Sequence, residues 1–218
     1  MGKKQLRQSS LKIVCMSDTH GLHRELDVPE GDVLIHAGDI SPLSGGHLTI
    51  VDFNSWLGEL PHRFKCVVPG NHDFALERKP SRLSLLSNAV VLVNEGINIR
   101  GLRIWGCPVT SLESDVFGLG SAEARSKVYS QIPQDTDVLV THEPPHGILD
   151  ADFDSNWHFG CRELLEAVTR VRPKLHVFGH VHTGYGIFET DDTMFVNASQ
   201  LDMYGGLNSP LVFRLTSR

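Results

Sequence analysis

Five short groups of polar residues along the chain contain side chains that bind divalent metal ions. Each group follows a short apolar run rich in β-branched residues, and the groups are Asp18-Thr19-His20, Gly38-Asp39, Gly70-Asn71-His72-Asp73, Thr141-His142 and Gly179-His180-Val181-His182. Such runs are typical of buried strands, so we expect strand ends that converge on one site. Asp, Asn and His are ligands for hard or borderline divalent ions, and no Cys belongs to the set. These residues predict a two-metal hydrolytic centre that acts on phosphate.

The spacing inside the groups indicates how ligands could be shared between two ions. Asp18 and His20 are two residues apart, so on an extended chain both side chains point to the same side and can reach one ion. Asp39 follows Gly38, which lets the backbone turn sharply before a carboxylate that could bridge two cations. His180 and His182 are also two apart, but on a turn each could serve a different ion.

The other histidines have plainer interpretations. His36 and His176 lie inside apolar runs and are predicted to be hydrogen-bonded core residues. His176 could also form a hydrogen bond that orients a metal ligand. The histidines that have no second ligand-type residue at a matching spacing are expected at the surface. They are His23, His47, His62, His146 and His158. The last two flank the segment around His142 and are the strongest of these for a role at the site.

Apolar patterning predicts a chain in which early strands alternate with helices and the last part consists of strands and turns. Strands are expected at 11–16, 33–37, 66–69, 89–93, 102–105, 138–141, 175–178, 186–189, 194–196 and 211–215, and helices at 47–60, 122–132 and 160–172. Several strands are continuous apolar runs, which suits strands covered on both faces. The expected fold class is therefore α/β, with two mixed β-sheets packed face to face and helices outside.

At 218 residues, without an internal repeat or a linker, the chain is predicted to form one domain over 11–218, preceded by a flexible basic tail at 1–10. The segment 106–120 has no clear periodicity, and it is either a substrate-facing loop or plain surface.

Composition narrows the range of partners. A net charge of −6 argues against a general nucleic-acid binder, and no run approaches the ~18 apolar residues of a membrane span. The 4 cysteines are widely spaced, so buried free thiols are favoured over disulfides. Free thiols indicate a reducing compartment, and a cytoplasmic location is expected.

As a set, the motifs D-x-H, G-D, G-N-H-[DE], H and G-H-x-H resemble the signature of the calcineurin-like metallophosphoesterase superfamily, from Asp18 to His182. The resemblance implies a four-layer α/β fold of two mixed sheets flanked by helices. It implies a first metal held by Asp18, His20, Asp39 and His182. It implies a second metal that shares Asp39 and adds Asn71, His142 and His180. His72 would be the catalytic histidine that does not bind metal.

Finer features resemble the small, single-domain group called metallophosphoesterase-domain-containing proteins. Class III cyclic-nucleotide phosphodiesterases have the same core. The finer features are the phrases at 52–60, 67–73 and 141–145 and the triplet Asn197-Ala198-Ser199. The Ser/Thr protein phosphatases carry G-D-x-V-D-R-G, whereas Asp39 is followed here by Ile40-Ser41-Pro42.

The expected activity is dinuclear metal-dependent hydrolysis of a phosphodiester, for example a cyclic nucleotide, through a hydroxide that bridges the metals. Asp39 and His72 would be catalytic, and Asn71, His72 and Trp157 would contact the substrate. Asp73 would either orient His72 or cap a following helix. Mn²⁺ is the favoured metal, with Fe or Zn²⁺ as alternatives. The competing hypotheses are a phosphomonoesterase acting on a nucleotide or small metabolite, a non-catalytic scaffold that binds nucleotides or partners, and a nuclease.

Overall fold

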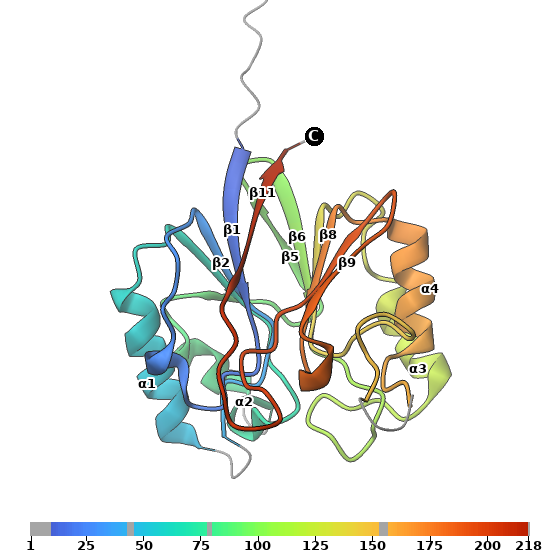
Figure 1. Cartoon of the computed structure of the whole chain (residues 1–218). Helices are drawn as coiled ribbons and strands as arrows, with labels where there is room; N and C mark the ends of the chain where they lie inside the picture. Colours follow the sequence, from blue (N-terminus) through green and yellow to red (C-terminus); the bar gives the residue numbers. More distant parts are fainter. Residues whose placement is uncertain (1–9, 43–45, 78–79, 153–156, 218) are drawn as a thin grey trace, which may run out of the picture.

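A computed structural model describes residues 10–42, 46–77, 80–152 and 157–217 (Figure 1). The predicted tail at 1–10 lies outside these ranges except for Ser10, which begins the first strand.

The first sheet has five strands in the order β11-β1-β2-β3-β4. Their bounds are β1 Ser10–Met16, β2 Val33–His36, β3 Phe64–Val67, β4 Val90–Val91 and β11 Leu211–Thr216. Strands β1 to β4 run parallel, and β11 pairs with β1 in the antiparallel direction. The carboxyl ends of β1, β2 and β3 therefore meet at one edge of the sheet.

The second sheet has six strands in the order β5-β6-β7-β8-β10-β9. Their bounds are β5 Glu95–Ile99, β6 Leu102–Cys107, β7 Val138–Thr141, β8 Leu175–Phe178, β9 Gly186–Glu189 and β10 Met194–Asn197. The four central strands are parallel, while β5 and β9 close the two edges as antiparallel partners.

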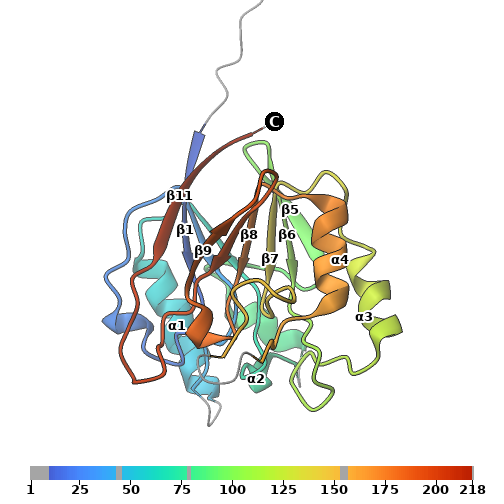
Figure 2. The same ribbon diagram turned by 45° about the vertical axis from the view of Figure 1, so that its right-hand side comes forward.

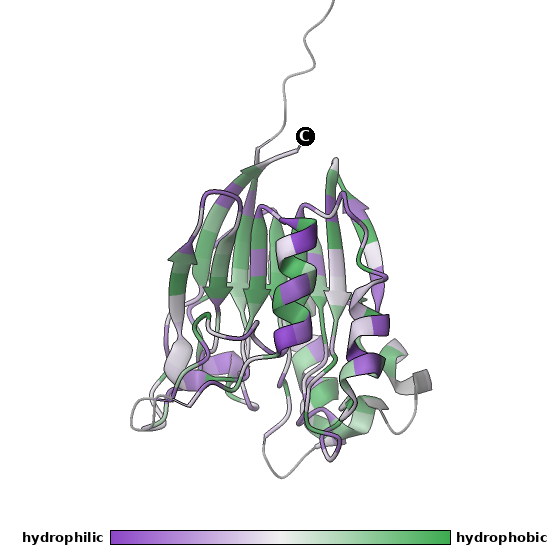
Figure 3. Cartoon of the chain, turned by 90° about the vertical axis from the view of Figure 1, so that its right-hand side faces the viewer, coloured by the Kyte–Doolittle hydropathy of each residue, from purple (hydrophilic) through white to green (hydrophobic). Residues whose placement is uncertain are grey.

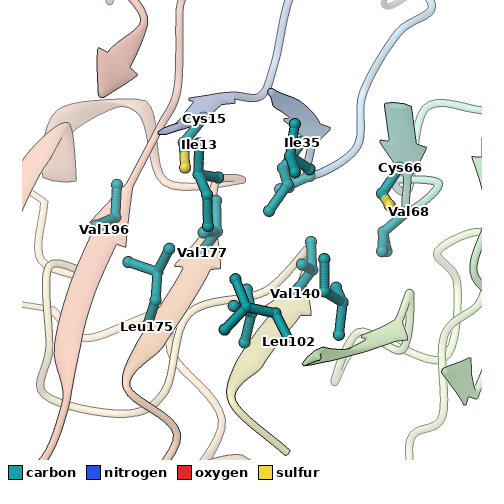
Figure 4. Close-up of a cluster of buried hydrophobic side chains, with 14 of the residues drawn as sticks. Ile13, Cys15, Ile35, Cys66, Val68, Leu102, Val140, Leu175, Val177 and Val196 are labelled. Carbon is teal, nitrogen blue, oxygen red and sulfur yellow. The ribbon is translucent and has the colours of Figure 1, made fainter. Parts of the chain in front are cut away.

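The two sheets pack face to face between helices, which gives four layers (Figures 1 and 2). Aliphatic side chains of both sheets fill the space between them, among them Ile13 and Ile35 from one sheet and Val140 and Val177 from the other (Figure 4). Helix α1 (His47–Glu59) covers the outer face of the first sheet through a second apolar cluster. Helices α3 (Ala122–Tyr129) and α4 (Arg162–Val171) cover the second sheet through a third.

Hydropathy follows the same layers. The strands are mostly apolar along their length, whereas the helices turn polar stripes away from the sheets (Figure 3). The predicted α/β class with two mixed sheets flanked by helices is confirmed. All 4 cysteines are buried and free, as expected. Within the described residues, no helix combines the length and the apolar character that crossing a bilayer requires.

Besides short 3-10 helices, one strand and one α-helix were not predicted. Strand β5 contains Glu95, Gly96 and Asn98, which disfavour strands, and it forms at the sheet edge as the first half of a hairpin with β6. The hairpin turn is Arg100-Gly101, where both residues have positive φ, of 50° and 91°. Such turns usually carry Asn-Gly or Asp-Gly, and because this turn has neither dipeptide, the sequence did not indicate a hairpin. The short helix α2 (Phe74–Glu77) has too few residues to show a periodicity.

The expectation of surface positions is wrong for His23 and His62, which are 1% and 2% exposed. The ring of His23 packs against Phe53 and Trp56 of α1 and bonds through Nε2 to Asp52. The Nε2 of His62 donates to the carbonyl oxygen of Pro29. In each ring a hydrogen bond to one nitrogen offsets part of the cost of burying the ring, and spacing alone does not reveal that partner.

Candidate metal centre

The five polar groups lie at the carboxyl ends of β1, β2, β3, β7 and β8, on the lower side of the molecule in Figure 2. The first three belong to one sheet and the last two to the other, so both sheets supply side chains to one place. The structure brings together all the residues that the sequence singled out as metal ligands: Asp18, His20, Asp39, Asn71, His142, His180 and His182.

The first group of side chains is formed by Asp18, His20 and His182. The Nε2 atoms of His20 and His182 are 3.2 Å apart, and the Nε2 of His182 is 3.4 Å from Asp18 Oδ1. The Nδ1 of His20 donates to the carbonyl oxygen of Ser41 at 3.0 Å. In the neutral ring the Nε2 lone pair of His20 therefore points at His182 and Asp18. Converging lone pairs and a carboxylate fit a cation.

The second group is formed by Asn71, His142 and His180. The Oδ1 of Asn71 lies 2.8 Å from His142 Nε2 and 3.0 Å from His180 Nδ1. The Nδ1 of His142 donates to the carbonyl oxygen of Ala37 at 2.9 Å, which in the neutral ring leaves its Nε2 as an acceptor. An amide oxygen and two imidazole nitrogens thus converge on a second point, again with a geometry that suits a cation.

Asp39 lies between the two groups. Its Oδ1 is 3.5 Å from His142 Nε2, while its Oδ2 is 3.7 Å from His20 Nε2. One carboxylate oxygen therefore faces each group. The ligand atoms of Asp18, His20 and His182 lie within 4.8 Å of one another, and so do those of Asp18, Asp39 and His142. The residues fit a pair of ions that share Asp39.

The site is buried and negatively charged at its centre. Burial acts to raise the pKa of Asp18, but the hydrogen bond from His182 and the charge of His142 hold that pKa below its usual range. Burial acts on Asp39 in the same way, and there the charge and the hydrogen bond of His142, together with the charge of His20, outweigh burial and lower the pKa. Both carboxylates are therefore ionised at neutral pH, and two buried anions require positive charge beside them.

The histidines respond to these carboxylates in different directions. Burial acts to lower the pKa of His142, but the charge and the hydrogen bond of Asp39, together with the charge of Asp18, raise it to about 10. Burial and the charge of His142 lower the pKa of His180 to about 4, so the ring of His180 is neutral at pH 7 and offers a lone pair. A cation bound here would replace the proton on His142 as the partner of Asp39.

The backbone is strained where these ligands project. Asp18, His20, Asp39 and His180 all have positive φ, of 51°, 43°, 56° and 68°. Non-glycine residues rarely adopt this conformation, and it is retained mainly where a functional geometry requires it. Gly179 also makes this geometry possible, because a Cβ at this position would collide with the carboxylate of Asp18.

Two buried histidines support the ligand-bearing loops. The Nε2 of His36 bonds to Thr19 Oγ1 at 3.1 Å, and the Nε2 of His176 bonds to Thr141 Oγ1 at 2.9 Å. Burial lowers the pKa of both to about 3, which keeps the rings neutral. Each anchors the threonine beside a ligand histidine, so the predicted core histidines also position the site.

Asp73 has a role that the sequence did not indicate. Its buried carboxylate accepts hydrogen bonds from the backbone N–H groups of Gly70 at 2.8 Å, Ser41 at 3.0 Å and Ile40 at 3.4 Å. These bonds join the loop that carries Asp39 to the loop that carries Asn71. The two roles considered for Asp73, orienting His72 and capping a helix, do not include this connection.

His72 lies at the mouth of the site. Its backbone N–H donates to Asp39 Oδ1 at 2.8 Å, and its Nε2 is 3.9 Å from Asp39 Oδ2. The imidazole lines an open hollow of about 500 Å³ together with His20, Asp39, His180 and His182. It can therefore reach a group bound beside the metal ligands without belonging to them.

The rest of this hollow is lined by side chains that the sequence did not single out, which are Leu112, Asp152, Phe159, Val181, Thr183 and Met203. Trp157, the predicted substrate contact, instead lines an adjoining hollow with His146 and His158. Leu112 belongs to the irregular segment 106–120, which favours the substrate-facing interpretation of that segment. No periodicity or motif marks Phe159 or Met203, so only the fold could reveal them.

The role of Asp73 leads to a first prediction. Asp73→Asn puts an amide where three backbone donors need an acceptor, so it should destabilise the fold by roughly 1–3 kcal/mol and lower Mn²⁺ affinity by about 10-fold or more. Urea unfolding and titration calorimetry measure the two effects.

Asp137→Asn is the matched control for Asp73→Asn. Asp137 is also buried; it lies directly before β7, accepts a hydrogen bond from the backbone N–H of Arg103 and pairs with Lys174. This control should lose stability and keep its Mn²⁺ affinity. Equal Mn²⁺ affinities in the two variants would show that Asp73 does not position the ligands.

Comparison with known proteins shows the family to which the chain belongs. The chain is 37% identical over 231 residues to human metallophosphoesterase domain-containing protein 1, covering 94% of this chain and 71% of that protein. It is 35% identical over 224 residues to a Caenorhabditis elegans protein of the UPF0046 group, covering 95% and 76% of the two chains. One solved structure superposes with a TM-score of 0.65 at 18% identity, over 96% of this chain and 100% of that one, which supports the fold. The family model described as calcineurin-like phosphoesterase matches residues 11–184, and the chain belongs to this metallophosphoesterase family.

Proposed function

We propose that the chain is a phosphodiesterase that hydrolyses a small phosphodiester at a centre of two divalent ions. The observation that carries the proposal is the position of Asp39, whose two carboxylate oxygens face two separate groups of ligands. One ion would be held by Asp18, His20, Asp39 and His182. The other would be held by Asp39, Asn71, His142 and His180. When bound, such a pair of ions supplies a hydroxide nucleophile near neutral pH and neutralises charge on the phosphate.

The residues of the chain would hold and prepare the substrate. During hydrolysis a bond forms between phosphorus and the oxygen of a water that has lost one proton to solvent, while the bond to the leaving alcohol oxygen breaks. His72 lines the hollow at the site mouth, and in its protonated form it would give a proton to that leaving oxygen. Asn71 and His72 are the proposed substrate contacts on this side of the site.

The lining of the hollow supports a diester over a monoester. Beyond the metal ligands, its described residues are His72, Thr183, the carboxylate of Asp152 and four apolar side chains, with no Lys or Arg. A diester carries one negative charge and two organic groups, so it suits such a lining better than a dianionic monoester does. Cyclic nucleotides are diesters of this kind and are the first natural substrates to test.

Other features complete the proposal. Mn²⁺ is the first metal to supply, with Fe and Zn²⁺ as alternatives, because all three accept oxygen and nitrogen ligands. The buried free thiols are those of a protein kept in a reducing compartment, which supports a cytoplasmic location. We treat 11–218 as one domain that holds the whole site.

Substrate choice and metal dependence can be tested together. With Mn²⁺, the protein should hydrolyse bis(4-nitrophenyl) phosphate faster than 4-nitrophenyl phosphate, and a chelator should abolish turnover. Asp39→Asn should lower kcat/KM for the diester by at least about 100-fold, because the shared ligand loses its charge. Asp52→Asn, an exposed carboxylate on α1, is the control and should keep its activity. Preference for the monoester would overturn the diester assignment, and turnover in chelator would overturn the metal centre.

The acid role of His72 can be tested through the leaving group. His72→Ala should lower turnover of diphenyl phosphate by roughly 10²–10⁴-fold, because phenolate needs a proton as it leaves. The loss should be much smaller with bis(4-nitrophenyl) phosphate, whose leaving group is stable as an anion. His47→Ala, at an exposed histidine at the start of α1, should affect neither substrate. Equal losses on both diesters would contradict the acid role.

A further inference from the structure

Three large apolar side chains stand exposed around the mouth of the metal centre. Leu112, Phe159 and Met203 are 58%, 47% and 65% exposed, and all line the hollow that contains His20, His72 and His182. They come from three segments far apart in the sequence. Single exposed apolar residues are common, but a group of them beside a polar centre indicates a surface for an apolar part of a ligand.

The size of the hollow supports the same conclusion. Its volume is about 500 Å³, within the range of pockets that hold small organic ligands and more than a phosphate alone requires. Since the metal ligands form one part of its lining, a phosphoryl group held there would bring its ester substituent against the other part. We call Leu112, Phe159 and Met203 the apolar wall.

Hydrogen bonds fix the backbone segments that carry the apolar wall. The backbone N–H of Phe159 donates to the carbonyl oxygen of Asp150 at 3.0 Å. The buried carboxylate of Asp150 accepts from the N–H groups of Gly147 at 2.8 Å and Gly160 at 3.0 Å. When a ligand binds against backbone segments that are already ordered, the protein loses little conformational entropy.

The other two members of the wall lie in turns that are fixed in a similar way. On the Met203 side, Asp202 Oδ1 accepts from Tyr204 N–H at 2.8 Å and Gly206 N–H at 2.7 Å. On the Leu112 side, its carbonyl oxygen accepts from Asp115 N–H at 3.0 Å. Leu112 and Met203 therefore belong to turns with internal hydrogen bonds, and Phe159 follows a β-bridge between Ala151 and His158.

Charge in the hollow points to an uncharged substituent. Asp152 lies in the same lining and would repel a second phosphate or carboxylate on the ligand. An aromatic or aliphatic group against the apolar wall meets no such penalty, and it removes apolar surface of both partners from water.

We propose that Leu112, Phe159 and Met203 select substrates in which the phosphate ester carries an uncharged aromatic or apolar group, which packs on the apolar wall. This inference rests on the proposed function, because it places the phosphoryl group at the metal ligands. It assigns a specificity role to residues that take no part in the chemistry.

The test compares two phosphonates that differ in their single organic group. Calorimetry with the Mn²⁺-loaded protein should show that phenylphosphonate binds at least about 10-fold more tightly than methylphosphonate, since the phenyl ring buries more apolar surface. Phe159→Ala and Met203→Ala should each bring the two affinities closer together and leave methylphosphonate affinity within roughly twofold. Phe188→Ala is the matched control, because Phe188 on β9 is also 47% exposed and is not part of the hollow's lining.

Turnover of bis(4-nitrophenyl) phosphate by the same samples separates the two proposals. Selective binding of phenylphosphonate without diester turnover would keep the apolar wall and overturn the proposed function. Diester turnover with equal affinity for the two phosphonates would keep the proposed function and overturn the apolar wall. An unchanged ratio of the two phosphonate affinities in both wall variants would also overturn the apolar wall, and so would the absence of any phosphonate binding. Circular dichroism of each variant establishes that the exposed substitutions leave the fold intact.

Discussion

The carboxylate of Asp39 places a negative charge inside the protein, where water hardly reaches it. It is 2% exposed and lies between two groups of histidines, with one oxygen toward each. A buried anion next to a second one, Asp18, is stable only if positive charge is supplied at short range. In the protein alone that charge comes from a histidine whose pKa Asp39 raises to about 10, and a bound cation would take over the same task. The centre is thus built to attract cations before it can do any chemistry.

The two-sheet fold satisfies this constraint by bringing strand ends together. Parallel strands in both sheets end at the same side, so short loops after β1, β2, β3, β7 and β8 can all reach one point. The loops achieve this only with unusual backbone, as the positive φ of Asp18, His20 and Asp39 shows. Such strain costs of order 1–3 kcal/mol per residue, and the bonds made by Asp73 and the buried histidines help to offset it. The surrounding core of aliphatic side chains supplies the rigidity that keeps the loops in place.

Sequence alone could predict the parts that depend on local pattern. The apolar runs of β1, β7 and β8 and the polar residues that follow them were identifiable, because continuous burial leaves a clear signature. What it could not predict depends on contacts between distant segments. Asp73 looked like a residue of its own loop, yet its carboxylate binds the backbone of the loop after β2. Trp157 looked like the best wall for a substrate, whereas Phe159, two residues on, lines the hollow of the metal ligands. Strand β5 depends on pairing with β6, since its own residues disfavour a strand.

Anomalous diffraction from crystals grown with Mn²⁺ would show whether two ions share Asp39. We expect two peaks roughly 3.5–4 Å apart, with the Asp39 carboxylate between them. One peak should lie among Asp18, His20 and His182, and the other among Asn71, His142 and His180. A single peak at saturating Mn²⁺, or peaks that do not contact Asp39, would show that two ions do not share this carboxylate.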